Sequence, residues 1–261
     1  MSVQVVYKKK VKSSFSGTLV LFVDEKYKVN TSNNFISKNE VLYVNNILRN
    51  KKNDKNKLFT ININERKTAL IIPYKKNYLV NDFEKLGASC FEFLEKNSLK
   101  NIFLNSGSIA IKNADHILNH FIHGLKLKSY KFQIYKSKKN KKLIQIIVTG
   151  KSDRKIIKKL TALEQGIFLT RDLVSEPGNV LHPDEYARRI TKLRKFGLKV
   201  TVYNQKKLKK MGMNALLGVG QGSIRGSYLV TIEWNGAKNN SKPLGFVGKG
   251  VCFDTGGYSL K

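Results

Sequence analysis

Three side chains near the end of the sequence have the types and spacing for metal-assisted chemistry: Lys249, Asp254 and Lys261. They lie in residues 247–261, VGKGVCFDTGGYSLK, which we call the lysine–aspartate segment. Glycines flank Lys249, so its amine can approach a metal ion, which it binds only in the neutral form that desolvation and a nearby dication favour. The Asp254 carboxylate can bridge two metals, and such a pair activates water and polarises a carbonyl. After a pair of glycines, Lys261 is placed to stabilise the oxyanion of a tetrahedral intermediate.

The pattern alone leaves a structural interpretation open, because lysine, aspartate and glycines also occur together between the strands of α/β proteins. Upstream segments favour the chemical interpretation. They read RDLVSEPGNVLHPD (171–184), MGMNALLGVGQG (211–222) and, more loosely, GLKLKSYKFQIYKSKK (124–139). Together with the lysine–aspartate segment, and in the same order, they resemble the leucyl aminopeptidase (cytosol aminopeptidase) family from about residue 124 onward.

The resemblance implies a two-metal metallopeptidase that removes N-terminal residues from peptides. Lys249 and Asp254 match the metal ligands of the family, and Lys261 matches its catalytic lysine. The implied cofactors are two divalent metal ions, manganese or zinc, and the implied assembly is a homohexamer. The weakly matching first half of the chain fits the variable N-terminal domain of the family.

The resemblance also predicts that this chain is inactive by itself. In the family, the other metal-binding carboxylates and the arginine that helps to bind the bicarbonate base lie downstream of the segment ending at Lys261. Two metal ions carry about four positive charges and need several oxygen ligands, whereas this chain supplies one carboxylate and one amine. We therefore expect a truncated aminopeptidase that binds metal weakly, and a decayed gene, a split gene and an early stop all fit the sequence.

The hydrophobic pattern predicts an α/β fold, with an N-terminal α/β accessory domain followed by the first part of a mixed-sheet α/β metallopeptidase domain. We place the accessory domain at residues 1–150, a linking helix at 151–174 and the incomplete catalytic domain at 175–261. Within the first 174 residues, apolar runs predict strands at 18–23, 69–73, 101–104 and 143–148, and helical patterns lie at 81–96 and 152–174.

The second domain is predicted to begin where Pro177 and Gly178 end a helix, and Pro183 opens the next helix, at 184–196. Strands are predicted at 200–203, 228–234 and 244–247. Their alternation with a helix indicates a largely parallel sheet. If the chain stops at Lys261, such a sheet would keep exposed edges and apolar faces, which favour aggregation.

The charge of the chain suggests an alternative function, a noncatalytic basic module that binds nucleic acid. The sequence has 49 Lys and Arg against 18 Asp and Glu, a formal net charge of +31, and such an excess ordinarily attracts polyanions. The excess is mostly lysine, accompanied by abundant asparagine and isoleucine, which is typical of an AT-rich coding sequence. Its clusters at 51–57, 136–142 and 205–210 lack the regular aromatic spacing of a base-stacking surface. The pattern therefore favours nonspecific, salt-sensitive adhesion.

Two cysteines, Cys90 and Cys252, are too few for a disulfide framework, and they fit a reducing compartment. The N-terminus lacks the apolar core of a signal peptide, and no apolar run approaches the roughly 18 residues of a membrane span. We expect a soluble cytoplasmic protein with no membrane partner.

Other motifs are weaker. His116, His120 and His123 have a spacing that puts three imidazoles on one helical face, where they could bind zinc. Apolar residues occupy the opposite side, so we expect this face to be solvated instead. The glycines of residues 218–226 follow a helical stretch rather than a strand, which excludes a dinucleotide fingerprint. The sequence also lacks a phosphate loop and a GxSxG nucleophile elbow.

Overall fold

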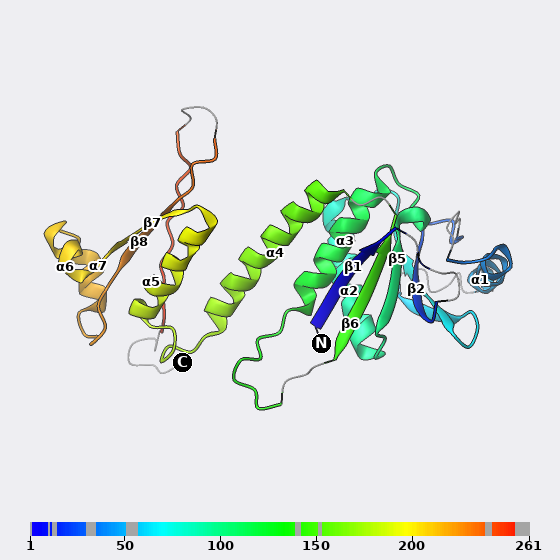
Figure 1. The fold of residues 1–261 in the computed structure, drawn as a ribbon, viewed down its shortest axis with the longest axis horizontal. Coiled ribbons are helices and arrows are strands. Elements are labelled where there is room, and N and C mark those ends of the chain that lie inside the picture. Colours follow the sequence, from blue (N-terminus) through cyan, green and yellow to red (C-terminus); the bar gives the residue numbers. More distant parts are fainter. Residues whose placement is uncertain are drawn as a thin grey trace. The chain divides into compact units, whose positions relative to one another are not determined.

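The chain is described by a computed structural model and divides into two compact units, residues 1–170 and 171–261 (Figure 1). The division falls between Thr170 and Arg171, within helix α4 (Arg154–Ser175). The three domain ranges expected from the sequence stay predictions, and each unit is treated below by itself. The residues that the structure describes are 2–9, 11, 15–29, 35–50, 57–138, 142–150, 153–237 and 242–253.

The first unit is built on a six-stranded sheet with the order β1-β6-β5-β2-β4-β3. All pairings in this sheet are parallel except that between β3 and β4. The apolar runs predicted as strands are β2, β4, β5 and β6, and they are apolar throughout because parallel strands are covered on both faces. β1 and β3 were not predicted. The bounds are β1 Ser2–Lys8, β2 Gly17–Val23, β3 Phe59–Asn62, β4 Lys67–Pro73, β5 Asn101–Asn105 and β6 Leu143–Thr149.

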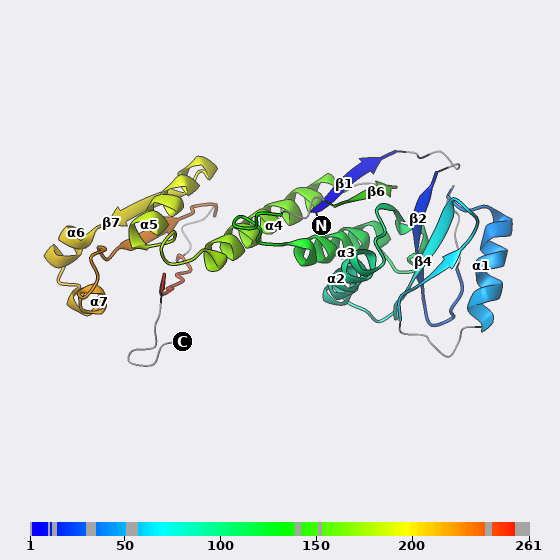
Figure 2. The same cartoon turned by 90° about the horizontal axis from the view of Figure 1, so that it is seen from below.

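Helices cover both faces of this sheet. Figure 2 shows α1 (Lys38–Asn50) on one side of β2 and β4, and α2 (Val80–Lys96) and α3 (Ala114–Ser129) on the other. Alternate residues of β2 divide between two cores: Val20 and Phe22 pack with α2 and α3, and Leu19 and Leu21 pack with α1. A short 3-10 helix, η2 (Ser106–Ser108), follows β5.

Two glycines allow α2 and α3 to approach to backbone contact. A Cβ atom built on Gly87 of α2 would lie 1.9 Å from the carbonyl oxygen of Phe121 on α3. A Cβ atom on Gly124 of α3 would lie 1.9 Å from the carbonyl oxygen of Glu84 on α2. The helix pair therefore depends on the absence of a side chain at both positions.

The sequence predicted that the histidine face of α3 is exposed to solvent. This prediction is wrong for His123, which is 5% exposed. Glu164 of α4 covers this face, and one of its oxygens lies 2.9 Å from Nδ1 of His123 while the other lies 2.9 Å from Nζ of Lys126. His120 is also partly buried, with its Nδ1 2.7 Å from Glu84. The apolar side of α3 is buried as expected, but α4 buries part of the histidine side as well.

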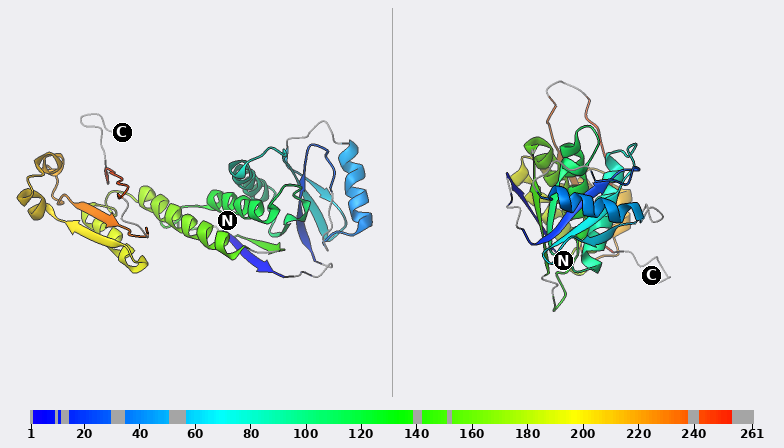
Figure 3. Two further views of the ribbon diagram at one scale, coloured as in Figure 1. Left: turned by 90° about the horizontal axis from the view of Figure 1, so that it is seen from above. Right: turned by 90° about the vertical axis from the view of Figure 1, so that its right-hand side faces the viewer.

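The second unit contains one antiparallel strand pair, in which Lys199 lies opposite Glu233 and Tyr203 opposite Leu229. Figure 3 shows the two strands side by side in its left view. The prediction of a largely parallel sheet here is wrong, because α6 and α7 return the chain to the end of β7 at which β8 begins. The segment 244–247, predicted as a strand, has no regular structure. The bounds are α5 Pro183–Thr191, η3 Lys192–Phe196, β7 Lys199–Tyr203, α6 Gln205–Lys210, α7 Asn214–Gly220 and β8 Leu229–Glu233.

Candidate active site

Of the three predicted site residues, the structure describes Lys249. It lies in the irregular segment 242–253 of the second unit, and its side chain is exposed. Asp254 and Lys261 lie outside the described residues. The structure therefore places one predicted metal ligand, and the joint geometry of the three residues stays a prediction.

The described part of the lysine–aspartate segment packs against the beginning of the second unit at two points. A Cβ atom built on Gly250 would lie 3.0 Å from Cε1 of Tyr186 on α5. A Cβ atom built on Gly178 would lie 3.1 Å from Cβ of Phe253 and 3.3 Å from the carbonyl oxygen of Cys252. Residues about 70 positions apart in sequence are thus in contact at both points.

The loop that carries Gly178 is held by backbone hydrogen bonds. The carbonyl oxygen of Pro177 accepts from the N–H groups of Val180 and Leu181 at 2.9 and 2.8 Å, and the Leu181 side chain is buried. Pro183 then takes a first-turn position of α5, where its fixed φ suits the helix and its missing N–H costs nothing. As these proline and glycine residues predicted, one helix ends at Ser175 before the loop and the next begins at Pro183.

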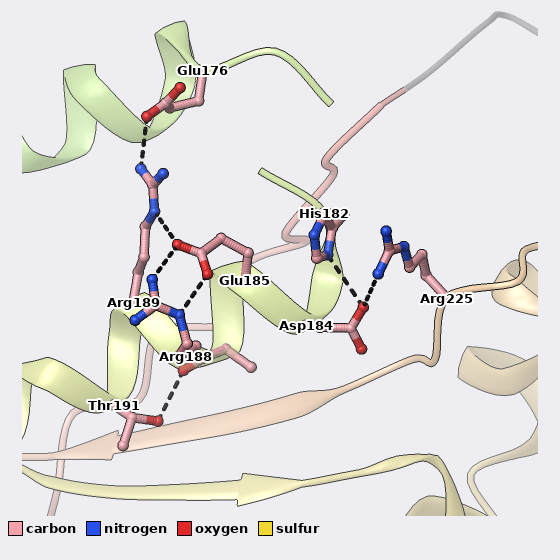
Figure 4. A network of polar contacts seen from close by, with 9 residues as sticks. Glu176, His182, Asp184, Glu185, Arg188, Arg189, Thr191 and Arg225 are labelled. Carbon is pink, nitrogen blue, oxygen red and sulfur yellow. Dashed lines mark hydrogen bonds and ion pairs between the residues drawn. The ribbon is translucent and has the colours of Figure 1, made fainter. Parts of the chain in front are cut away.

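Helix α5 is tied to the same loop by an ion-pair network (Figure 4). Arg189 donates to Glu176 at 2.8 Å and to Glu185 at 2.8 Å, and the Glu176 side chain is only 4% exposed. The exposed Arg188 donates twice to the partly buried carboxylate of Glu185. The two arginines stabilise the charged carboxylate and lower the pKa of Glu185 to about 2.

A second contact set joins the start of α5 to the residues that precede β8. Asp184 accepts a hydrogen bond of 2.7 Å from the Tyr228 hydroxyl, and an Arg225 nitrogen lies 3.5 Å from its other oxygen. That oxygen also lies 3.2 Å from Nδ1 of His182 (Figure 4). The hydrogen bond from Tyr228 is the main reason that the pKa of Asp184 is lowered, with a smaller contribution from Arg225. The sequence analysis did not predict these contacts, although His182 and Asp184 lie in the segment 171–184, which resembles the family.

The described residues do not form a site for a metal pair. No three His, Cys, Asp or Glu side chains within the described ranges gather closely enough to hold an ion, which includes the three histidines of α3. Lys249 is the one predicted ligand in that part of the chain, and it is exposed to water.

The first unit has a cavity that the sequence did not predict. Its volume is about 390 Å³, and it lies where β2 and β4 end, at the carboxyl edge of the sheet. The lining combines three tyrosines with two acidic residues: Asp24, Glu25, Tyr27, Pro73, Tyr74, Lys75, Tyr78 and Leu86. None of the residues predicted to act on a substrate lines this cavity.

Two family sequence models match the chain, in the order in which the family carries them. Residues 75–139 match the N-terminal domain of the cytosol aminopeptidase family, and residues 168–261 match its catalytic domain. The chain belongs to the cytosol aminopeptidase family. The catalytic-domain match includes α5, the Pro177–Gly178 loop and the lysine–aspartate segment.

Curated members of the cytosol aminopeptidase family align with much of this chain. A probable cytosol aminopeptidase of Phytoplasma australiense is 42% identical over 189 residues, which is 70% of this chain and 38% of the relative. One from Phytoplasma mali is 39% identical over 203 residues, 73% of this chain and 41% of the relative. One from Brucella melitensis biotype 1 is 47% identical over 147 residues, 53% of this chain and 30% of the relative. The chain thus spans well under half of the length of these relatives.

Solved structures share the fold of this chain. A mutant of tomato leucine aminopeptidase superposes with a TM-score of 0.69 at 16% identity, covering 88% of this chain and 50% of that one. The bottromycin maturation enzyme in complex with Mn gives 0.64 at 18% identity, covering 84% and 45%. These likenesses confirm the predicted fold class, an α/β accessory domain followed by the first part of a mixed-sheet catalytic domain.

The matches also extend the resemblance stated from the sequence. The family model of the N-terminal domain begins at residue 75, about 50 residues before the first motif recognised in the sequence. It includes α2, β5 and α3, which contribute many residues to the core of the first unit. Among the described residues, no helix has the length and apolar character needed to cross a membrane.

Proposed function

We propose that this chain provides the N-terminal domain and the first part of the catalytic domain of a leucyl-aminopeptidase-like, metal-dependent peptidase that removes N-terminal residues from peptides. The observation that carries the proposal is the lysine–aspartate segment, which lies within the region matched by the family's catalytic-domain model. In this proposal Lys249 and Asp254 bind metal, and Lys261 stabilises the oxyanion that forms at the first peptide bond.

The proposed cofactors are two divalent ions, manganese or zinc, and when bound they would supply an activated water and a polarised carbonyl. The Asp254 carboxylate is a donor for either ion, and Lys249 is a donor as the neutral amine. Because Lys249 is exposed among the described residues, parts of the domain outside them would have to desolvate its amine.

We further propose that the 261-residue polypeptide alone has no peptidase activity. One amine and one carboxylate do not neutralise two dications or fill their coordination shells. Turnover would require further carboxylates, supplied in the same active site by additional polypeptide. The proposed substrates are peptides with a free N-terminus, the proposed assembly is the family's homohexamer and the proposed compartment is the cytoplasm.

The test is hydrolysis of leucine p-nitroanilide by the purified 261-residue chain, with saturating Mn²⁺ or Zn²⁺ and with Asp254→Ala as the matched control. We expect no release of nitroaniline above this control. Metal-dependent turnover that Asp254→Ala abolishes would mean that the chain assembles a working site with ligands that we have not identified. It would contradict the proposed inactivity while supporting the proposed chemistry.

A further inference from the structure

We propose that Gly178 and Tyr186 are positioning residues that hold the lysine–aspartate segment in place, and we call the pair the cradle. The role that we assign to the cradle depends on the proposed function, because the segment that it holds would present Lys249 and Asp254 to the metal ions. The evidence for the cradle is a set of contacts among described residues. Neither residue carries chemistry of its own, and neither would touch the substrate.

The first contact of the cradle is made by Tyr186. The ring lies on α5 and is half-buried. A Cβ atom on Gly250 would lie 3.0 Å from Cε1 and 3.5 Å from Cδ1 of this ring, whereas nonbonded carbon atoms settle at about 3.5–4.0 Å. The backbone next to Lys249 therefore rests directly on the tyrosine ring, and this close approach explains why glycine suits position 250.

The second contact is made by Gly178. A Cβ atom there would lie 3.1 Å from Cβ of Phe253 and 3.3 Å from the carbonyl oxygen of Cys252. Gly178 is not in a left-handed conformation, because the positive-φ glycines of the described chain are others. Glycine is thus favoured here by the approach of the backbone immediately before Asp254, and not by its own dihedral angles.

The two contacts bracket Val251 and Cys252, so they restrict both ends of a four-residue stretch. The supporting groups are themselves fixed. Gly178 follows Pro177, whose carbonyl accepts two hydrogen bonds, and α5 is tied to the same loop by the ion pair between Arg189 and Glu176. A segment without regular secondary structure is thereby held by a hydrogen-bonded loop and a helix. Such support from neighbouring groups is what a site needs to keep its ligands in a productive geometry.

The test traps the Gly178 contact with a disulfide bond. In a Cys252→Ser background, Gly178→Cys with Phe253→Cys would place the two Cβ atoms 3.1 Å apart, a few tenths of an ångström below the usual disulfide range of about 3.5–4.5 Å. We expect near-complete cross-linking under mild oxidation. The matched control is Gly218→Cys with Phe253→Cys, because a Cβ atom on Gly218 meets no atom within 4 Å. This control should stay reduced.

The role of Tyr186 is tested by the rate of the same cross-link. Tyr186→Ala releases the segment at Gly250 and should slow cross-linking at least about fivefold by lowering the effective concentration of the two thiols. Tyr186→Phe keeps the ring and should cross-link at the original rate. A slow rate in Tyr186→Ala together with the original rate in Tyr186→Phe would assign the effect to the loss of the ring contact. If Tyr186→Ala fails to fold, Gly250→Leu separates the same two surfaces without changing α5, and it should slow the reaction similarly.

Two results would overturn the cradle: a Gly178–Phe253 pair that cross-links no faster than the Gly218 control, or variants at both Tyr186 and Gly250 that leave the rate unchanged. The assay contains neither metal nor substrate. Failure of the cradle is therefore distinguishable from failure of the proposed function, which would appear as normal cross-linking but absent peptidase turnover once additional polypeptide completes the catalytic domain.

Discussion

The contact between α2 and α3 gives a quantitative prediction, because a single methyl group is enough to disturb it. In Gly124→Ala, the new Cβ atom would lie 1.9 Å from the carbonyl oxygen of Glu84, roughly 1.5 Å inside the contact distance of about 3.5 Å. Both partners are helix backbone, so no side chain can rotate away and the helices must separate. Overpacking of this kind costs about 1–3 kcal/mol, occasionally more. Alanine recovers about 0.5–1 kcal/mol of helix propensity. Because a backbone clash lies at the upper end of the overpacking range, the expected net loss is about 2 kcal/mol.

The assay follows unfolding of the first unit through Cys90, which lies on α2 and is 0% exposed. In a Cys252→Ser background, thiol labelling as a function of urea reports the fraction of molecules in which this core has opened. With an m value of about 2 kcal/mol per molar urea, a loss of about 2 kcal/mol lowers the midpoint by about 1 M.

Gly166→Ala is the matched control for this substitution. Gly166 is an exposed position of α4, and a Cβ atom there meets nothing within 4 Å. It should therefore gain the helix-propensity term of about 0.5–1 kcal/mol alone. If Gly124→Ala behaved like Gly166→Ala, leaving the midpoint unchanged or raising it, the close packing of α2 on α3 would be refuted.

Three further predictions concern charges and thiols. Arg189→Met removes one of the groups that contact the nearly buried Glu176 carboxylate, and the second unit should lose about 2 kcal/mol; an unchanged calorimetric transition would contradict the ion pair. Because the pKa of Glu185 is lowered from 4.5 to about 2, its charged form stabilises the fold above pH 4.5, and this contribution is lost as the pH falls through about 2. The difference in Tm between the native chain and the Glu185→Gln variant should therefore be largest at pH 6 and vanish near pH 2. A difference that does not change with pH would contradict the lowered pKa of Glu185. A thiol reagent should label Cys252 in the native chain and leave Cys90 unlabelled, whereas equal labelling would mean that the first core is open.

Some helices and strands were predictable because the apolar pattern of their own residues indicates the type of element. The strand at residues 143–148 and the helix at residues 152–174 were found from local apolar patterns, since one is covered on both faces and the other buries a stripe. The direction of β8 was not predictable. A 25-residue connection with two short helices can cross over the sheet, which makes the next strand parallel to β7. It can also return to the carboxyl end of β7, which makes the next strand antiparallel, and the local sequence does not distinguish these two routes.

The sequence points to candidate site residues, which stay a prediction, and it does not reveal what surrounds them. Lysine, aspartate and glycines at fixed spacing marked the lysine–aspartate segment, because the chemistry depends on those residue types. Its contacts with Gly178 and Tyr186 join stretches about 70 residues apart. The local pattern of one stretch contains no information about the other. The burial of His123 was missed for a similar reason, since it depends on Glu164 of a helix that the histidine spacing does not reveal.

We propose that residues 168–261 form part of an aminopeptidase catalytic domain that becomes active when the rest of the domain is supplied. The most direct measurement is leucine p-nitroanilide hydrolysis by a chimera in which these residues replace the aligned part of the Phytoplasma australiense relative, which supplies the rest of the domain. We predict Mn²⁺- or Zn²⁺-dependent turnover that is abolished by Lys249→Ala or Asp254→Ala. A folded chimera without turnover, or turnover that survives both substitutions, would contradict the assignment of this segment to the active site.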